Sequence, residues 1–123
     1  MGVVSNADDD FLDELMELRG IAAWVDDRTS SEEAQSCKPD QRIFEVALRK
    51  AARDASETLF VGDSLAHDVA GAHAAGMRTV LIEEPDSVAP MSIGLDASVP
   101  ADFTVRTLAE VVAIVDTANA EGE

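Results

Sequence analysis

The feature that most constrains the fold is residues 58–77, which read TLFVGDSLAHDVAGAHAAGM. The segment opens with an apolar, partly β-branched run, breaks at Gly62, Asp63 and Ser64, and continues with helical spacing as far as Gly76. This pattern predicts a buried strand that leads directly into a helix. Ser64 suits the N-cap of that helix, and Gly76 suits a left-handed C-cap.

Two acids lie where the predicted strand gives way to the helix. Asp63 ends the strand, and Asp68 falls in the first or second turn of the helix. Both can therefore face the crevice beyond the carboxyl end of the strand, where open α/β sheets bind ligands. Taken alone, Gly-Asp-Ser indicates only a turn and a cap, and an early Asp also suits the positive end of the helix dipole. A binding site therefore needs support from the rest of the chain.

Apolar and polar periodicity predicts strands and helices that alternate along the whole chain. We expect an α/β fold with a parallel, doubly wound sheet. A domain boundary is expected at residue 118, before a disordered tail at 119–123. The other expected elements are a strand tip before Ser5, a helix from Asp8 to Gly20, a weak strand and a loop in 26–36, a helix from Pro39 to about Arg53, a strand at 78–82, a surface loop at 83–101, a strand at 102–105 and a helix capped by Thr107.

The predicted helices carry specific expectations for their buried faces. Pro39 is expected in the first turn of its helix. Trp24 is expected as a core or lid contact. The residues expected to face inward are Ile43, Phe44, Ala47, Leu48, Ala51 and Ala52 in the helix after Pro39, and Leu108, Val111, Val112 and Val115 in the last helix.

Composition narrows the classes of protein. The 123 residues, 46% of them hydrophobic, suffice for one modest domain with a core. A formal charge of −16 argues against a general basic surface for nucleic acid or an anionic membrane. The single Cys37 cannot form an intrachain disulfide, and no apolar run of bilayer-spanning length or basic leader is present, so we expect a cytoplasmic protein.

Polar residues with complementary chemistry lie at three predicted strand ends or in the adjoining loops. These residues are Ser5 with Asn6, then Lys38, then Asp63 with Asp68. Two carboxylates can hold Mg²⁺, which prefers oxygen ligands and keeps several waters. An ammonium and a hydroxyl can hold the oxygens of a phosphoryl group in its transition state. The three sets are therefore chemically complementary.

Other reactive residues fit such a site less well. Asp8 and Asp10 form a D-x-D pair, but a nucleophile held at a strand tip should follow the apolar run directly, and Ser5 occupies that place. Acids at a helix start complement the macrodipole without further function. His67 and His73 are spaced six residues apart and do not share a helical face, and Cys37 has no evident His partner.

The sequence resembles the haloacid dehalogenase (HAD) superfamily of hydrolases over about residues 3–82. Residues 3–6 (VVSN) look like the family's second motif, whose Ser or Thr hydrogen-bonds the substrate phosphoryl. Residues 38–40 (KPD) look like the third, whose Lys steadies the nucleophile and the phosphoryl charge. Residues 61–64 (VGDS) with Asp68 look like the fourth, whose acids bind Mg²⁺. The details are similar to the phosphatase-like and dehalogenase-like branch, which has a three-layer, Rossmann-like sheet with helices on both faces.

The chain departs from this family at its beginning. The first motif is an apolar strand that ends in D-x-D; its first Asp attacks the substrate and its second acts as general acid and base. No residue of this chain matches either position, and the helical cap that selects the substrate is also missing. The resemblance therefore implies an incomplete core domain that lacks the nucleophile strand.

In the family's sheet, that strand lies between the strand at Val3 and Val4 and the strand at residues 59–61. Without it, each neighbour exposes unpaired backbone groups, which natural proteins seldom leave open. Three outcomes are expected as alternatives: the two strands pair directly, another chain supplies a strand, or the domain is marginally stable. Pairing of exposed edges between copies would give a homo-oligomer.

Two functional hypotheses follow from the resemblance. The first is a magnesium-dependent phosphatase for a small phosphorylated metabolite, with a halogenated substrate as the dehalogenase variant. It implies catalytic roles for Lys38 and Ser5, substrate binding by Ser5, Asn6 and Lys38, and metal binding by Asp63 and Asp68. The second is a catalytically silent, truncated remnant or a binding module. For the chain by itself we expect no activity, because the nucleophilic Asp is missing.

Overall fold

The computed structural model describes the chain except for residues 19, 21–22, 24, 84–97 and 122–123. The expectation for Trp24 and most of the loop expected at 83–101 lie outside the described residues. In the part of the chain that is described, every helix is too short or too polar to cross a bilayer.

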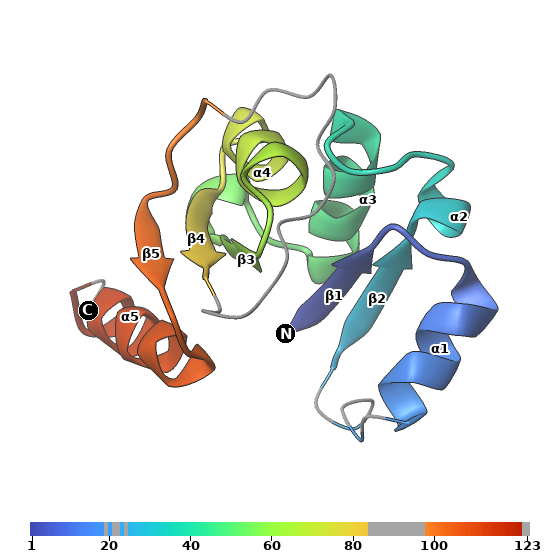
Figure 1. Ribbon diagram of the computed structural model, residues 1–123, viewed down its shortest axis with the longest axis horizontal. Helices are drawn as coiled ribbons and strands as arrows, with labels where there is room; N and C mark the ends of the chain where they lie inside the picture. Colours follow the sequence, from blue (N-terminus) through green and yellow to red (C-terminus); the bar gives the residue numbers. More distant parts are fainter. Residues whose placement is uncertain (19, 21–22, 24, 84–97, 122–123) are drawn as a thin grey trace.

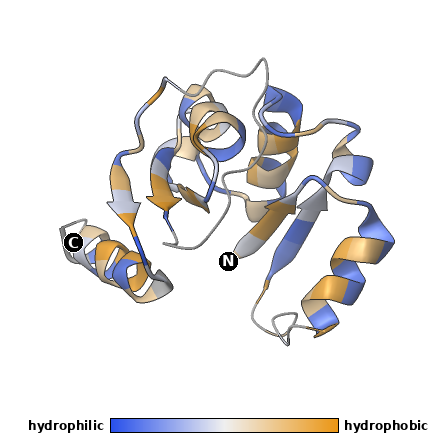
Figure 2. Cartoon of the chain, viewed as in Figure 1, coloured by the Kyte–Doolittle hydropathy of each residue, from blue (hydrophilic) through white to orange (hydrophobic). Residues whose placement is uncertain are grey.

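The strands form two parallel sheets (Figure 1). In the first, β1 (Gly2–Ser5) pairs with β2 (Asp27–Ser30), with Ser5 opposite Ser30. In the second, β4 (Arg78–Ile82) lies between β3 (Leu59–Gly62) and β5 (Phe103–Val105). Figure 2 shows β2 as largely hydrophilic beside a more hydrophobic β1, as suits a strand at the edge of a sheet.

Helices lie on both sides of these strands, with α3 and α4 on one side and α1 and α5 on the other (Figure 1). The parallel strands and the helices between them confirm the predicted α/β class. The helices are α1 (Asp9–Leu18), α2 (Ser31–Ala34), α3 (Gln41–Ala51), α4 (Ala70–Ala74) and α5 (Leu108–Glu121), with a 3₁₀ turn η2 (Ala55–Glu57) and a π-helical turn η3 (Leu65–Val69).

The start and the buried face of α3 differ from the expectation. The helix begins at Gln41, because the Asp40 side chain caps it by accepting from the backbone N–H of Arg42 at 3.2 Å. Pro39 therefore precedes the helix. Of the expected buried stripe, Ile43 and Phe44 are fully buried, Ala47 and Leu48 are half-buried, and Ala51 and Ala52 are exposed. The last turn extends past the core and ends in a left-handed cap at Ala52, which has a φ of 54°.

Residues 26–36 contain the expected strand, β2, but part of the expected loop is the short helix α2. Ser30 caps α2, because its Oγ accepts from the backbone N–H of Glu33 at 2.9 Å. Glu32 and Glu33 lie in the first turn, where negative charge complements the helix dipole. The Ser-x-x-Glu pattern at residues 30–33 is a capping-box signature that could have predicted this helix.

The last helix is capped as expected but packs differently. Thr107 Oγ1 accepts from the backbone N–H of Glu110 at 3.4 Å, and the Glu110 carboxylate accepts from the N–H of Thr107 at 3.4 Å. The inward placement expected for Val112 and Val115 is wrong, because these side chains are 59% and 39% exposed. The helix also continues to Glu121, past the boundary expected at residue 118.

The hydrophobic core connects the two sheets. Phe44 of α3 and Phe60 of β3 meet edge to face, with ring centroids 5.3 Å apart and an interplanar angle of 64°. Such aromatic pairs add to the free energy of burial. The buried cluster consists of Ala34, Ile43, Phe44, Ala72 and Met77, with partly buried neighbours that include Val4 of β1. Helix α3 contacts β1, β2 and α4, so the core holds together sheets that share no backbone ladder.

Strands β1 and β3 do not pair with each other. Among the described residues, β1 is bonded only to β2, and β3 only to β4. Of the three expected alternatives, direct pairing of these strands is therefore wrong. Each strand keeps one edge without a partner in the described part of the chain.

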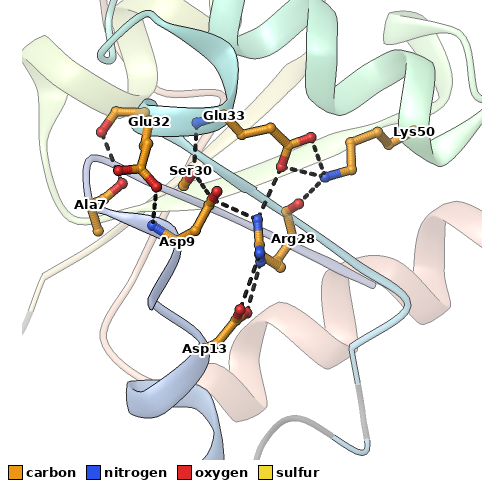
Figure 3. Close-up of polar contacts among 9 residues, drawn as sticks. Ala7, Asp9, Asp13, Arg28, Ser30, Glu32, Glu33 and Lys50 are labelled. Carbon is orange, nitrogen blue, oxygen red and sulfur yellow. Dashed lines mark hydrogen bonds and ion pairs between the residues drawn. The ribbon is translucent and has the colours of Figure 1, made fainter. Parts of the chain in front are cut away.

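A network of charged side chains fastens α1, β2, α2 and α3 (Figure 3). Arg28 of β2 donates to Asp13 at 2.8 Å, to Asp9 at 2.8 Å and to Glu33 at 3.1 Å. Lys50 of α3 donates to Glu33 at 3.0 Å and also to the carbonyl of Arg28. The network explains how a polar strand such as β2 can hold three helices.

The network predicts an acid-sensitive contribution from Asp9. The hydroxyl of Ser30, which donates to Asp9, and the guanidinium of Arg28 lower the pKa of Asp9 below its ordinary value of 3.8. A depressed pKa stabilises the fold fully above the unfolded-state pKa, and this contribution is lost as the pH falls through the folded-state pKa. In urea unfolding, the native chain should have a higher free energy of unfolding than Asp9→Asn near neutral pH, and this difference should shrink below about pH 4.

Asp10→Asn is the control, because Asp10 is exposed on the same turn of α1. Its stability should run parallel to that of the native chain through the acid range. A constant gap between the native chain and Asp9→Asn from pH 6 to pH 2 would contradict the assignment.

Candidate active site

A partly buried ion pair lies at the centre of the candidate site. Lys38 Nζ donates to Asp68 Oδ1 at 2.6 Å, and the two side chains are 15% and 5% exposed. Lys38 Nζ also lies 5.9 Å from the ring centroid of Phe60 in β3. Removing one partner of such a pair costs about 3–5 kcal/mol, because the other charge stays buried. The structure therefore brings together two residues that the sequence predicted for one site.

The turn after β3 holds the other oxygen of Asp68. The backbone N–H of Ser64 donates to Asp68 Oδ2 at 3.2 Å. The helix begins as the π turn η3, in which the N–H groups of Asp68 and Val69 both point to the carbonyl of Ser64, at 3.0 and 3.1 Å. Single π turns occur frequently at functional sites. Both oxygens of the Asp68 carboxylate are therefore fixed.

Ser64 caps this helical segment, as expected. Its Oγ accepts from the backbone N–H of His67 at 3.1 Å and lies 3.0 Å from His67 Nδ1. Gly76 has the left-handed φ of 91° predicted for the end of the helix. His67 thus has a local partner in Ser64, while His73 is exposed.

Gly62 is a site residue whose role sequence reasoning did not explain. A Cβ placed on Gly62 would lie 2.3 Å from Cβ and Cγ of Asp68 and 2.4 Å from its Oδ2. Only glycine leaves room for the carboxylate against the end of β3. The signal in the sequence was a glycine at a strand tip directly before an acid, which marks a close approach without naming the group that approaches.

Asn6 reaches Lys38 through its side-chain amide. Asn6 Oδ1 accepts from the backbone N–H of Lys38 at 2.7 Å, and Asn6 Nδ2 donates to the Lys38 carbonyl at 3.3 Å. Asn6, Lys38 and Asp68 therefore form one connected group. Ser5 ends β1 next to Asn6 and is half-buried, and the described contacts do not join its side chain to this group.

The two acids differ in environment. Asp63 is exposed directly after β3, whereas Asp68 is buried beside Lys38. Within the described residues, no group of three or more His, Cys, Asp or Glu side chains gathers as a metal site. Two carboxylates nevertheless fit Mg²⁺, which is commonly bound through one or two carboxylates, waters and substrate oxygens. Each carboxylate oxygen can accept more than one bond, so Asp68 keeps capacity beside Lys38.

Candidates that the sequence disfavoured lie outside this group. Cys37 is a free, exposed cysteine. Asp8 and Asp10 are exposed at the start of α1. The half-buried Asp9 between them contacts Arg28 and Ser30, so the acids at this helix start contribute to the structure.

Known proteins with similar sequences include phosphatases. The chain is 34% identical over 103 residues to ribulose-1,5-bisphosphate 5-phosphatase of Halopiger xanaduensis, covering 81% of this chain and 43% of that protein. It is 32% identical over 96 residues to glyceraldehyde 3-phosphate phosphatase of Methanocaldococcus jannaschii, covering 78% of this chain and 40% of that protein. The chain thus spans less than half the length of these curated relatives.

Comparison with solved structures and with family models points to the same class of protein. The crystal structure of a HAD phosphatase from Thermococcus onnurineus superposes with a TM-score of 0.78 at 26% identity, covering 93% of this chain and 49% of that one. The Rossmann-like, three-layer architecture expected from the resemblance is therefore confirmed. The family model described as haloacid dehalogenase-like hydrolase matches residues 1–82, which include Asn6, Lys38 and Asp68. This chain belongs to the haloacid dehalogenase-like hydrolase family.

Proposed function

We propose that the chain is part of a magnesium-dependent phosphatase that acts on a small phosphorylated metabolite. The observation that carries the proposal is the partly buried pair of Lys38 and Asp68, joined to Asn6 where three separate segments meet. Phosphoryl transfer is catalysed mainly by positioning and by electrostatic stabilisation. A fixed ammonium next to a carboxylate able to hold a cation supplies both.

Each residue has a proposed role. Lys38 stabilises the charge of the phosphoryl group and of the nucleophile, and Ser5 contacts the substrate at the end of β1. Asn6, expected from the sequence to bind the substrate, holds the Lys38 backbone beside it. Asp63 and Asp68 would hold Mg²⁺, which supplies charge stabilisation at the phosphoryl oxygens. Asp68 would then serve Mg²⁺ as well as Lys38, with which it forms an ion pair.

The nucleophile is proposed to come from a strand that this chain does not contain. Strands β1 and β3 each have a free edge in the described residues, and Asn6 and Asp63 follow the ends of these two strands. A parallel strand seated between them would present its own end beside Lys38, because carboxyl ends of parallel strands share one edge of a sheet. We therefore propose that the 123-residue chain is inactive and that an apolar strand ending in D-x-D completes the site.

The relatives favour a phosphatase over a dehalogenase. The two relatives described above are named as phosphatases, and each is more than 30% identical to this chain. A (S)-2-haloacid dehalogenase of Pseudomonas is also similar, at 28% identity over 123 residues. The substrate class we propose is therefore a small phosphorylated compound.

A silent binding module is the second candidate. It is favoured by one observation, the pairing of Lys38 with Asp68, since this contact offsets the charge of the ammonium. Such a module would bind a ligand at the same site without hydrolysing it.

Activity measured on two forms of the protein separates these candidates. We expect the purified chain to hydrolyse an aryl phosphate no faster than background with Mg²⁺ present, because it lacks a nucleophilic Asp. The same chain joined in frame to an upstream apolar strand ending in D-x-D should show magnesium-dependent turnover. In that completed form, Asp63→Asn should reduce kcat by roughly 10²-fold, the order lost with one electrostatic contact in a transition state.

Asp54→Asn provides the matched control, because Asp54 is exposed and its side chain makes no capping bond. Its turnover should equal that of the completed parent. Hydrolysis by the unmodified chain would refute the inactivity, and equal turnover in Asp63→Asn would remove Asp63 from the metal site.

A further inference from the structure

We infer that Asn6 is a positioning residue. Its side chain fixes the backbone of Lys38 and thereby the place where the Lys38 ammonium meets Asp68. The inference rests on the proposed function only for the role of that ammonium in phosphoryl transfer. The contacts of Asn6 with the Lys38 backbone are present in this chain whatever its function.

Both ends of the Asn6 amide are engaged by one residue. The oxygen Oδ1 accepts from the Lys38 N–H at 2.7 Å, and the nitrogen Nδ2 donates to the Lys38 carbonyl at 3.3 Å. A carboxamide offers an acceptor and a donor together, whereas a carboxylate offers acceptors only. Asn6 therefore holds both polar groups of a single peptide residue, and a direct substrate contact would have to compete with these bonds.

This contact spans two sheets that share no backbone ladder. Asn6 directly follows β1, and Asp68 follows β3 in the other sheet. The route between them is Asn6 to the Lys38 backbone, the Lys38 side chain to Asp68 Oδ1, and Asp68 Oδ2 to the Ser64 N–H. Asn6 thus ties the end of β1 to the acid after β3 through Lys38.

The lysine needs such an anchor because of its flexible side chain. A lysine has a four-carbon stem with about 2 kcal/mol of rotamer entropy, so its ammonium is placed well only if its backbone is placed well. Nearby, Gln41 Nε2 donates to the Gly71 carbonyl at 3.0 Å and ties the start of α3 to α4. Asn6 fixes the side of the loop that carries Lys38, before α3 begins.

Nuclear magnetic resonance of the 123-residue chain tests the inference without any need for turnover. With ¹⁵N-lysine labelling, the Lys38 ammonium signal reports the bond to Asp68, and the exchange rate of the Lys38 amide proton reports the bond to Asn6. In Asn6→Ala we expect the Lys38 amide to exchange at least about tenfold faster and the ammonium signal to broaden. Asn6→Asp keeps the acceptor and loses the donor, so its Lys38 amide should remain more protected than in Asn6→Ala.

Asn119→Ala is the matched control, since Asn119 is exposed on α5, far along the chain from the site. The amide of Phe44 in the core serves as the internal reference. If all amides, including that of Phe44, accelerate equally in both Asn6 variants, Asn6 acts on global stability and the inference is overturned. An unchanged Lys38 ammonium signal in Asn6→Ala overturns it as well.

In the completed enzyme, positioning also predicts a specific kinetic pattern. Asn6→Ala should lower kcat about tenfold with KM nearly unchanged, whereas loss of a direct substrate contact would raise KM. If the Lys38 signals respond but the completed protein hydrolyses no phosphate, positioning stands and the phosphatase proposal fails. If the completed protein hydrolyses the phosphate ester but the Lys38 signals do not respond, the phosphatase proposal stands and positioning by Asn6 fails.

Discussion

Replacing Phe44 with alanine should lower the free energy of unfolding by about 3–5 kcal/mol. The Phe44 side chain is fully buried and meets Phe60 edge to face. It also fills the space beside Gly71, where an added Cβ would lie 2.4 Å from Phe44 Cε2. Because this ring joins α3, β3 and α4, the cavity left by alanine opens where the two sheets are held together.

Urea unfolding followed by circular dichroism measures this loss. Phe11→Ala is the matched control, because Phe11 lies on α1 with 59% of its surface exposed. Its unfolding free energy should stay within about 0.5 kcal/mol of the native value. A loss below about 1 kcal/mol in Phe44→Ala would mean that another contact holds the sheets together.

Replacing Gly62 with alanine should break the candidate site and destabilise the fold by about 1–3 kcal/mol, as expected for overpacking. The new Cβ would overlap the Asp68 carboxylate, which sits 2.3–2.4 Å from that position. Since pairing with β4 fixes the backbone of β3, the side chain of Asp68 has to turn away. The bond to Lys38 and the bond to the Ser64 N–H should then be lost together.

The Lys38 ammonium signal of Gly62→Ala, measured beside its unfolding free energy, tests this prediction. Gly20→Ala is a useful contrast: Gly20 has a φ of 69°, and an added Cβ would meet nothing within 4 Å. It should therefore cost about 1–2 kcal/mol of backbone strain and leave the Lys38 signal unchanged. A native Lys38 signal in Gly62→Ala would show that Asp68 is not confined as the structure places it.

The division of the strands into two sheets gives these predictions a common basis. Strands β1 and β3 are joined by side chains, through the core around Phe44 and through the contacts of Asn6, Lys38 and Asp68. Substitutions in either set should therefore lower the free energy of unfolding more than they would in a continuous sheet. There, backbone hydrogen bonds between the strands would supply part of the stability.

The sequence alone determined the local features of this protein. The strand at residues 59–62 follows from its apolar, partly β-branched run. The Ser64 cap, the left-handed Gly76 and the capping pair of Thr107 and Glu110 follow from contacts or conformations of residues close along the chain. The set of Asn6, Lys38 and Asp68 was also predictable, because carboxyl ends of parallel strands meet at one edge of a sheet. Its motifs at residues 3–6, 38–40 and 61–64 resemble those of the family to which the chain belongs.

Only the tertiary structure decided how these pieces meet. That Asn6 holds the Lys38 backbone and that Val112 and Val115 stay exposed depend on segments distant in sequence or on the extent of neighbouring elements. The close approach of Gly62 to Asp68 depends on the three-dimensional path of the turn between them. Periodicity reports which face of a helix is apolar, but it does not say whether another element covers that face. Side-chain contacts across a fold depend on distances that no local pattern contains.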